Sequence, residues 1–90
     1  MRSIIQDKEE CWFCKDTFVE EHHCFGGANR KFSEKYGLKV YLCHNHHNEP
    51  PFGVHFNKEA MDKIRRVAQA KFEETHTREE FMRIFGRNYL

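Results

Sequence analysis

The sequence predicts a small α+β domain that a bound metal ion stabilises. We expect a two-stranded hairpin with a helix, then a longer C-terminal helix and a short terminal helix. The chain has 90 residues, enough for one domain with a small core. Most of its cysteines and histidines fall before residue 57, whereas the clearest helical periodicity comes after it. We therefore expect a single domain over residues 1–90, with a metal-binding core at 11–57 and a helical extension at 58–90.

The charge balance gives little information for the whole chain but more for its middle. The chain has 15 basic and 14 acidic residues. Residues 29–66 carry eight basic and four acidic groups, so a phosphate-facing surface is expected there, with a merely solvated face as the alternative. No apolar run approaches the roughly 20 residues of a membrane span. The first residues lack the apolar stretch of a signal peptide, which predicts a cytoplasmic protein with reduced thiols.

Two short ligand pairs predict a structural zinc site. The chain has four cysteines and seven histidines. Cys11 and Cys14 are separated by two residues, as are Cys43 and His46, and this spacing lets a tight turn present both ligands to one ion. Together they form a Cys3His set of the closed tetrahedral kind. Cys24 competes for the fourth position, but its apolar context favours a small core residue. Buried thiols without a metal are the other alternative.

Four more histidines are not needed by that zinc: His22, His23, His47 and His55. A single histidine is more often a surface or core residue than a ligand. Four of them near a zinc knuckle instead predict that at least two share a functional site. Imidazole is both a common metal ligand and a proton acceptor near neutral pH.

The first half of the chain contains the predicted strands. Ser3-x-x-Gln6 is a capping-box pattern that predicts a short helical turn. We expect strands near 17–25 and 38–42, separated by Gly26-Gly27 and a helical turn over 29–36 that ends at Gly37. Residues 43–48 are expected to form a turn or the first turn of a helix, which Pro50-Pro51 would stop.

The second half contains the predicted helices. Asn57 is a favourable N-cap, and apolar residues follow it at helical spacing over 58–74: Met61, Ile64, Ala68 and Phe72. Thr77-x-x-Glu80 is a second capping box. It predicts a short helix with Phe81, Met82 and Phe85 as its apolar contacts, ending at Gly86. The tail over 87–90 is expected to be irregular.

The order of these motifs resembles that of HNH endonucleases of the ββα-metal (His-Me finger) class. The resemblance covers residues 11–57 and is closest to small phage-type members with a structural zinc. Three segments carry it beside the cysteine pair: His22-His23-Cys24-Phe25-Gly26-Gly27-Ala28-Asn29-Arg30, then Cys43-x-x-His46-His47-Asn48, then Gly53-Val54-His55. The combined pattern is fairly specific, although each piece alone would be weak. The resemblance implies a ββα-metal fold.

The resemblance also implies roles for individual residues. His23 would be the general base, and His22 and His47 would hold a catalytic divalent ion. His55 would complete the metal shell or contact a phosphate. The family usually has Asp at the position of His22, and a nitrogen ligand there shifts the metal preference from Mg²⁺ toward Mn²⁺, Ni²⁺ or Zn²⁺. The family's middle Asn has no clear match, and the candidates are Asn29 and Asn48.

The predicted function is therefore a metal-dependent endonuclease that hydrolyses DNA phosphodiester bonds. The basic residues expected to contact the DNA backbone are Arg30, Lys31, Lys35 and Lys39. The location would be the host cytoplasm if the gene is phage-encoded. The alternative function is a non-catalytic zinc-binding module that binds nucleic acid or protein. A third reading is a degenerate nuclease that keeps the fold without activity. A second metal site, separate from the cysteines, would favour the endonuclease over the non-catalytic zinc-binding module.

Overall fold

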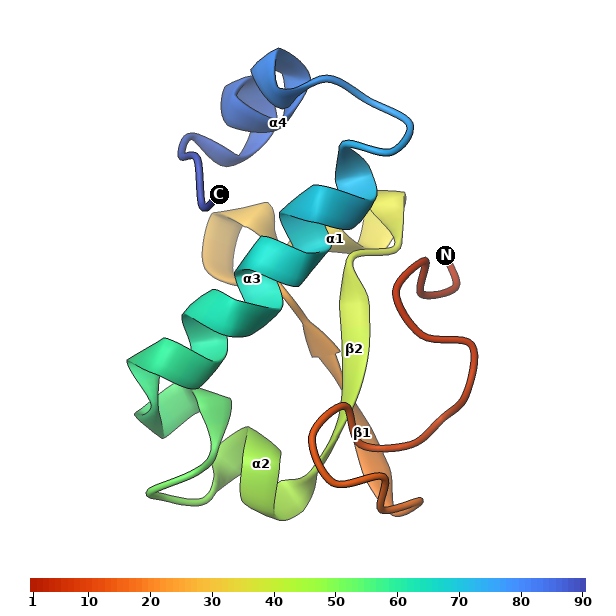
Figure 1. Cartoon of the computed structure of the whole chain (residues 1–90), viewed down its shortest axis with the longest axis vertical. Coiled ribbons are helices and arrows are strands. Elements are labelled where there is room, and N and C mark those ends of the chain that lie inside the picture. Colours follow the sequence, from red (N-terminus) through yellow and green to blue (C-terminus); the bar gives the residue numbers. More distant parts are fainter.

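Two antiparallel strands lie at the centre of the fold (Figure 1). The computed structural model describes all 90 residues, Met1–Leu90. Strand β1 spans Val19–His23 and β2 spans Lys39–Cys43. Val19 pairs with Cys43 at one end and His23 pairs with Lys39 at the other. Both predicted strands are present, although β1 is shorter than the predicted 17–25 and β2 starts and ends one residue later than the predicted 38–42.

The segment between the strands is helical. A 3-10 turn, η1 (Gly27–Asn29), leads into helix α1 (Arg30–Tyr36). The helix ends as predicted at Gly37, whose φ of 70° is left-handed and whose N–H bonds back to Ser33 and Glu34. Glycine adopts this conformation without the steric cost that a Cβ imposes. The turn lets the chain reverse directly into β2.

Four helical elements follow the second strand. They are α2 (His44–Asn48), the 3-10 turn η2 (Val54–Phe56), α3 (Lys58–Phe72) and α4 (Arg78–Phe85). Both predicted caps are confirmed: the Asn57 side chain accepts from the N–H of Ala60 at 3.0 Å, and Thr77 Oγ1 accepts from the N–H of Glu80 at 3.1 Å. None of these helices is both long and apolar enough to cross a membrane.

One hydrophobic core joins the metal-binding segment to the C-terminal helices. Phe25, directly after β1, packs against Phe81 and Phe85 of α4, with ring centroids 5.5 and 4.5 Å apart. Ile64, Ala68 and Phe72 of α3 are buried in the same cluster. Met61 and Met82 differ from expectation. Met61 is only partly buried, and Met82 is 45% exposed because it lies on the solvent side of α4.

The N-terminal segment runs beside β2 (Figure 1). The N–H of Trp12 donates to the carbonyl of Tyr41, and the N–H of Tyr41 donates to the side-chain oxygen of Gln6. These bonds occupy polar groups at the open edge of a two-stranded sheet. Ser3 Oγ accepts from the N–H of Gln6 at 3.1 Å. The predicted capping contact is thus present, but no helix follows it.

Candidate metal centres

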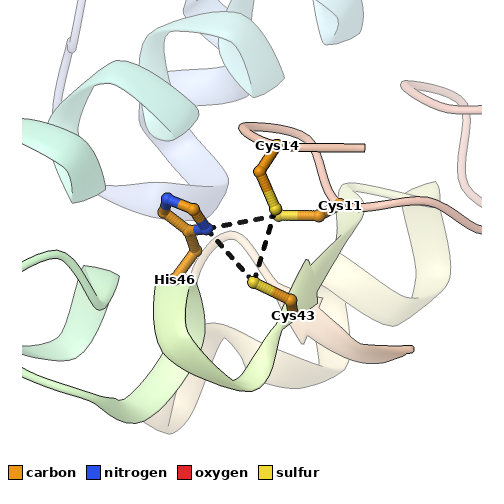
Figure 2. A group of neighbouring side chains, drawn as sticks. All are labelled: Cys11, Cys14, Cys43 and His46. Carbon is orange, nitrogen blue, oxygen red and sulfur yellow. Dashed lines mark hydrogen bonds between the residues drawn. The ribbon is translucent and has the colours of Figure 1, made fainter. Parts of the chain in front are cut away.

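The four predicted zinc ligands come together from three parts of the chain (Figure 2). Cys11 and Cys14 lie on a turn of the N-terminal segment, Cys43 ends β2, and His46 lies on α2. The N–H of Lys15 bonds to the carbonyl of Cys11 at 3.0 Å, which closes the turn. The turn therefore directs both of its sulfurs toward the end of β2.

The spacing of these four side chains fits a tetrahedral zinc ion. Cys14 Sγ lies 3.6 Å from Cys43 Sγ, and His46 Nδ1 lies 3.7 Å from Cys11 Sγ and 3.1 Å from Cys43 Sγ. In a tetrahedron with Zn–S of about 2.3 Å and Zn–N of about 2.0–2.1 Å, neighbouring ligand atoms lie roughly 3.5–3.8 Å apart. Two of the three distances fall in or near this range, and the third is only slightly shorter. This Cys3His cluster can hold a metal such as zinc.

Local hydrogen bonds favour a thiolate in this cluster. Burial alone would raise the pKa of Cys11, but hydrogen bonds led by the backbone N–H of Cys43 outweigh it and lower the pKa. Burial is the main cause that raises the pKa of Cys43 to about 11, and the neighbouring thiols of Cys14 and Cys11 contribute to this rise. The Cys11 thiol is therefore easier to deprotonate than an ordinary thiol. A divalent cation would favour deprotonation of the others.

Cys24 lies outside the cluster, as predicted. Its side chain is fully buried in the hydrophobic core. Burial raises the pKa of its thiol to about 12. A thiol in this environment stays protonated at neutral pH and packs as a small apolar group.

A second cluster consists of His22, His47 and His55. One ring nitrogen from each lies within 4.8 Å of the others. The ring centroids are 5.1 Å apart for His22 and His47, 5.3 Å for His22 and His55, and 4.9 Å for His47 and His55. Nitrogens bound to one ion at about 2.0–2.1 Å would lie roughly 3.0–3.4 Å apart. The upper limit of 4.8 Å between the nitrogens is compatible with this spacing.

His22 is the buried member of this cluster. It is only 4% exposed, and its Nε2 is the one buried side-chain polar atom without a hydrogen-bond partner. Burial is the main cause that lowers the pKa of His22 to about 3, and the charges of His47, His55, Arg65 and His23 contribute to this shift. The ring is therefore neutral at pH 7. A neutral imidazole with an unpaired buried nitrogen has the chemistry of a metal ligand.

His47 is oriented by a carboxylate that the sequence did not single out. Glu20 Oε1 lies 2.7 Å from His47 Nδ1, which leaves Nε2 of His47 available to a metal. Carboxylates commonly fix metal-binding histidines in this way. Glu20 precedes His22 by two residues on β1, so both side chains lie on the same face of the strand. The spacing of two residues between Glu20 and His22 on a predicted strand was the sequence signal that could have identified Glu20.

The loop after α2 places His55 beside His47. Gly53 packs directly on the end of α2, where a Cβ would come within 2.7 Å of the Glu49 nitrogen. The next residue, Val54, is buried and anchors η2. His55 is exposed, so the cluster combines one buried ligand with one that solvent reaches.

His23 does not join the three-histidine cluster. It follows His22 on the strand and belongs to a different group of side chains, with Glu21 and Glu34. Its Nε2 lies 3.0 Å from Glu34 Oε1. Because successive strand residues point to opposite faces, the strand turns His23 away from the face that carries His22. Asn48 is the candidate asparagine closer to the cluster, with Nδ2 3.3 Å from His47 Nδ1.

The expected basic surface is present in part. Arg30, Lys31 and Lys35 lie on α1 and are exposed. The prediction for Lys39 is wrong, because this residue is only 5% exposed. Its Nζ lies 3.4 Å from Glu21 and 3.2 Å from Glu34. Lys39 faces His23 across the strand pair, and its ammonium group neutralises carboxylates instead of contacting DNA.

Comparison with protein-family models, curated proteins and solved structures found no significant match for this chain. The candidate sites therefore rest on the residues and their geometry.

Proposed function

We propose that this protein is a metal-dependent endonuclease that hydrolyses DNA phosphodiester bonds. In this proposal β1, β2 and α2 form a ββα-metal unit. The Cys3His cluster binds a structural zinc, and the three-histidine cluster binds a catalytic divalent ion.

The observation that carries the proposal is the three-histidine cluster. It is separate from the cysteine cluster and draws its ligands from β1, α2 and η2. A purely structural zinc module has no need for a second open site with nitrogen ligands. This observation favours an enzyme over the alternative of a non-catalytic zinc-binding module that binds nucleic acid or protein.

The three histidines fit a divalent ion of intermediate hardness, one that accepts nitrogen ligands. Three imidazole nitrogens suit Zn²⁺, Ni²⁺ or Mn²⁺ better than Mg²⁺, which prefers oxygen ligands. When bound, such an ion supplies positive charge that stabilises the phosphate and the leaving oxygen during hydrolysis. The chain holds the ligand rings in place: burial fixes His22 and the Glu20 carboxylate orients His47.

The Cys3His cluster supports this arrangement through α2. His46 is a predicted zinc ligand and His47, the next residue, belongs to the three-histidine cluster. A zinc ion at the first cluster would therefore fix the helix that presents His47. A helix fixed in this way keeps the catalytic side chains in the positions that the reaction requires.

The proposal keeps His23 as the proton acceptor on the resemblance alone. The structure turns its ring toward Glu34, where it lines a surface cleft of about 530 Å³ with Gly27, Arg30 and Lys31. A general base acts within hydrogen-bond reach of the attacking water, so this role requires the His23 ring to turn from Glu34 toward the three-histidine cluster. The role of His23 is thus tested separately from that of the metal site.

A plasmid-cleavage assay tests the proposal. Zinc-loaded protein with added Mn²⁺ or Ni²⁺ should cleave DNA, and His47→Ala should not respond to the added ion. His44→Ala is the matched control, because His44 is an exposed histidine of the same helix outside the cluster. Its contact with Glu20 is an exposed ion pair of 3.6 Å, which contributes little. Wild-type protein that shows no cleavage with any of these ions would refute the proposal.

Two further variants test the roles of His23 and the basic surface. His23→Ala should lower cleavage by about 10²–10⁴-fold, the usual cost of removing a proton-transfer group, while the metal still binds. The double change of Arg30 and Lys31 to Ala should weaken binding to unrelated DNA sequences equally and flatten its salt dependence. A His23→Ala variant with full activity would remove His23 from the mechanism. An effect of the double change on one sequence only would indicate base recognition.

A further inference from the structure

A second charged cavity lies beside the three-histidine cluster. It has a volume of about 460 Å³ and is lined by residues of η2, the first turns of α3 and the C-terminal tail. The polar residues that line it are His55, Asn57, Lys58, Asp62, Arg65 and Arg87. His55 also belongs to the three-histidine cluster, so this cavity and the candidate catalytic site share one residue.

Two arginines in this cavity lack a carboxylate partner. No carboxylate lies within ion-pair distance of Arg65 or Arg87, whereas Arg78 and Arg83 pair with Glu73 and Glu79. Asp62 is the only acidic residue of the cavity. Its carboxylate is already bound to Lys58 Nζ at 2.6 Å. The two guanidinium groups are therefore available to an anion.

Both guanidinium groups are held in position against the same ring. Arg87 lies 4.9 Å from the centroid of Tyr89, and Arg65 lies 5.8 Å from it. Such cation–π contacts leave the N–H groups at the edge of each guanidinium free to donate. Arg65 is fixed further because its Nε donates to the carbonyl of Cys24 at 3.1 Å.

The tail that carries Arg87 is anchored to α3. Gln69 is fully buried, and its side chain accepts from the N–H of Tyr89 at 2.7 Å and donates to Asn88 at 2.8 Å. The tail therefore holds Arg87 in place although Arg87 itself is exposed.

We propose that Arg65 and Arg87 form a phosphate-binding site that holds a phosphodiester of the substrate next to the three-histidine cluster. The inference rests on the proposed function for the identity of the substrate. Two guanidinium groups match the oxygens of a phosphate through paired N–H bonds. The C-terminal helical extension then contributes to substrate binding as well as to the core.

Inorganic phosphate tests the site without any need for activity. In zinc-loaded, isotope-labelled protein, phosphate should shift the side-chain NMR signals of Arg65 and Arg87 and the ring signals of Tyr89. Arg87→Ala should weaken this binding. Arg83→Ala is the matched control, because Arg83 is an exposed arginine of α4 paired with Glu79. Shifts that are absent in wild-type protein, or unchanged in Arg87→Ala, would overturn the inference.

A short DNA duplex then distinguishes a DNA phosphodiester from free phosphate as the ligand. Binding is measured against salt without added divalent ion, so that the DNA stays intact. Loss of one phosphate contact should reduce the salt slope by about 0.9 and weaken binding about eightfold at roughly 0.1 M salt. An Arg87→Ala variant that binds DNA as tightly as Arg83→Ala would overturn the assignment to DNA, even if free phosphate binds.

The two proposals fail in different ways. Phosphate shifts at Arg65 and Arg87 in a protein that never cleaves DNA would support the anion site and refute the nuclease. Cleavage by a protein in which phosphate leaves these arginines unaffected would support the nuclease and overturn the anion site.

Discussion

Removal of the charge at Glu20 should weaken metal binding at the three-histidine cluster. Glu20 Oε1 lies 2.7 Å from His47 Nδ1, and this hydrogen bond is the main cause of the lowered pKa of Glu20. In Glu20→Gln a neutral amide replaces the carboxylate. The amide orients the ring less strongly and no longer increases the basicity of the ligand nitrogen. The geometry of the strand should not change.

The expected loss of metal affinity depends on how far Glu20 and His47 are exposed to solvent. Changes to groups that orient metal ligands typically cost about 10–100-fold in metal affinity. The Glu20 side chain is 46% exposed and that of His47 is 15% exposed, so solvent screens part of the interaction. We therefore expect the lower end of this range, about tenfold.

Calorimetric titration with Ni²⁺ measures this loss, using protein that carries one equivalent of zinc for the Cys3His cluster. Glu49→Gln is the matched control, because Glu49 Oε1 lies 2.8 Å from His44 Nε2 on the same helix but outside the cluster. Glu49→Gln should bind Ni²⁺ as wild type does. Equal affinity of Glu20→Gln and Glu49→Gln would refute the role of Glu20.

Three further predictions concern the zinc, the core and the response to pH. Cys11→Ser should lose its bound zinc after dialysis, whereas Cys24→Ser should retain it; zinc in both variants would contradict the Cys3His assignment. Phe81→Ala should lower the free energy of unfolding by about 3–5 kcal/mol, because Phe81 is fully buried, and a loss below about 1 kcal/mol in urea unfolding would contradict this packing. Without an added ion, stability should fall between about pH 7 and 5, because unfolded His22 gains a proton below about pH 6.5 whereas folded His22 stays neutral until about pH 3. His22→Gln should show a smaller fall over the same range, and an equal fall would contradict the pKa assigned to His22.

Features set by local sequence were predictable. The caps at Asn57 and Thr77 and the glycine at 37 depend on a few neighbouring residues, and each is where its pattern predicts. The four Cys3His residues also come together as their spacing predicts. The caps, the glycine and each ligand pair follow short-range rules, whereas the meeting of the two ligand pairs follows from the shared need for four ligands around one ion.

Features set by contacts across the sheet were not predictable. Lys39 reads as one more basic residue in a basic segment, but its pairing opposite His23 brings it to Glu21 and Glu34 and buries it. The position of His23 depends on which face of β1 turns toward α2, and that depends on the strand register. Glu20 was missed because its role appears only when α2 brings His47 to the same face.

The number of metal ions bound per chain tests the central claim most directly. Titration of metal-free protein with Co²⁺, followed by its visible absorption, separates a thiolate site from a site with nitrogen ligands. We expect two ions per chain, the first with thiolate-to-cobalt charge-transfer bands and the second without them. His47→Ala should bind only the first ion, and His44→Ala should bind both. A wild-type protein that binds one ion, or a second ion that His47→Ala retains with unchanged affinity, would contradict the three-histidine site.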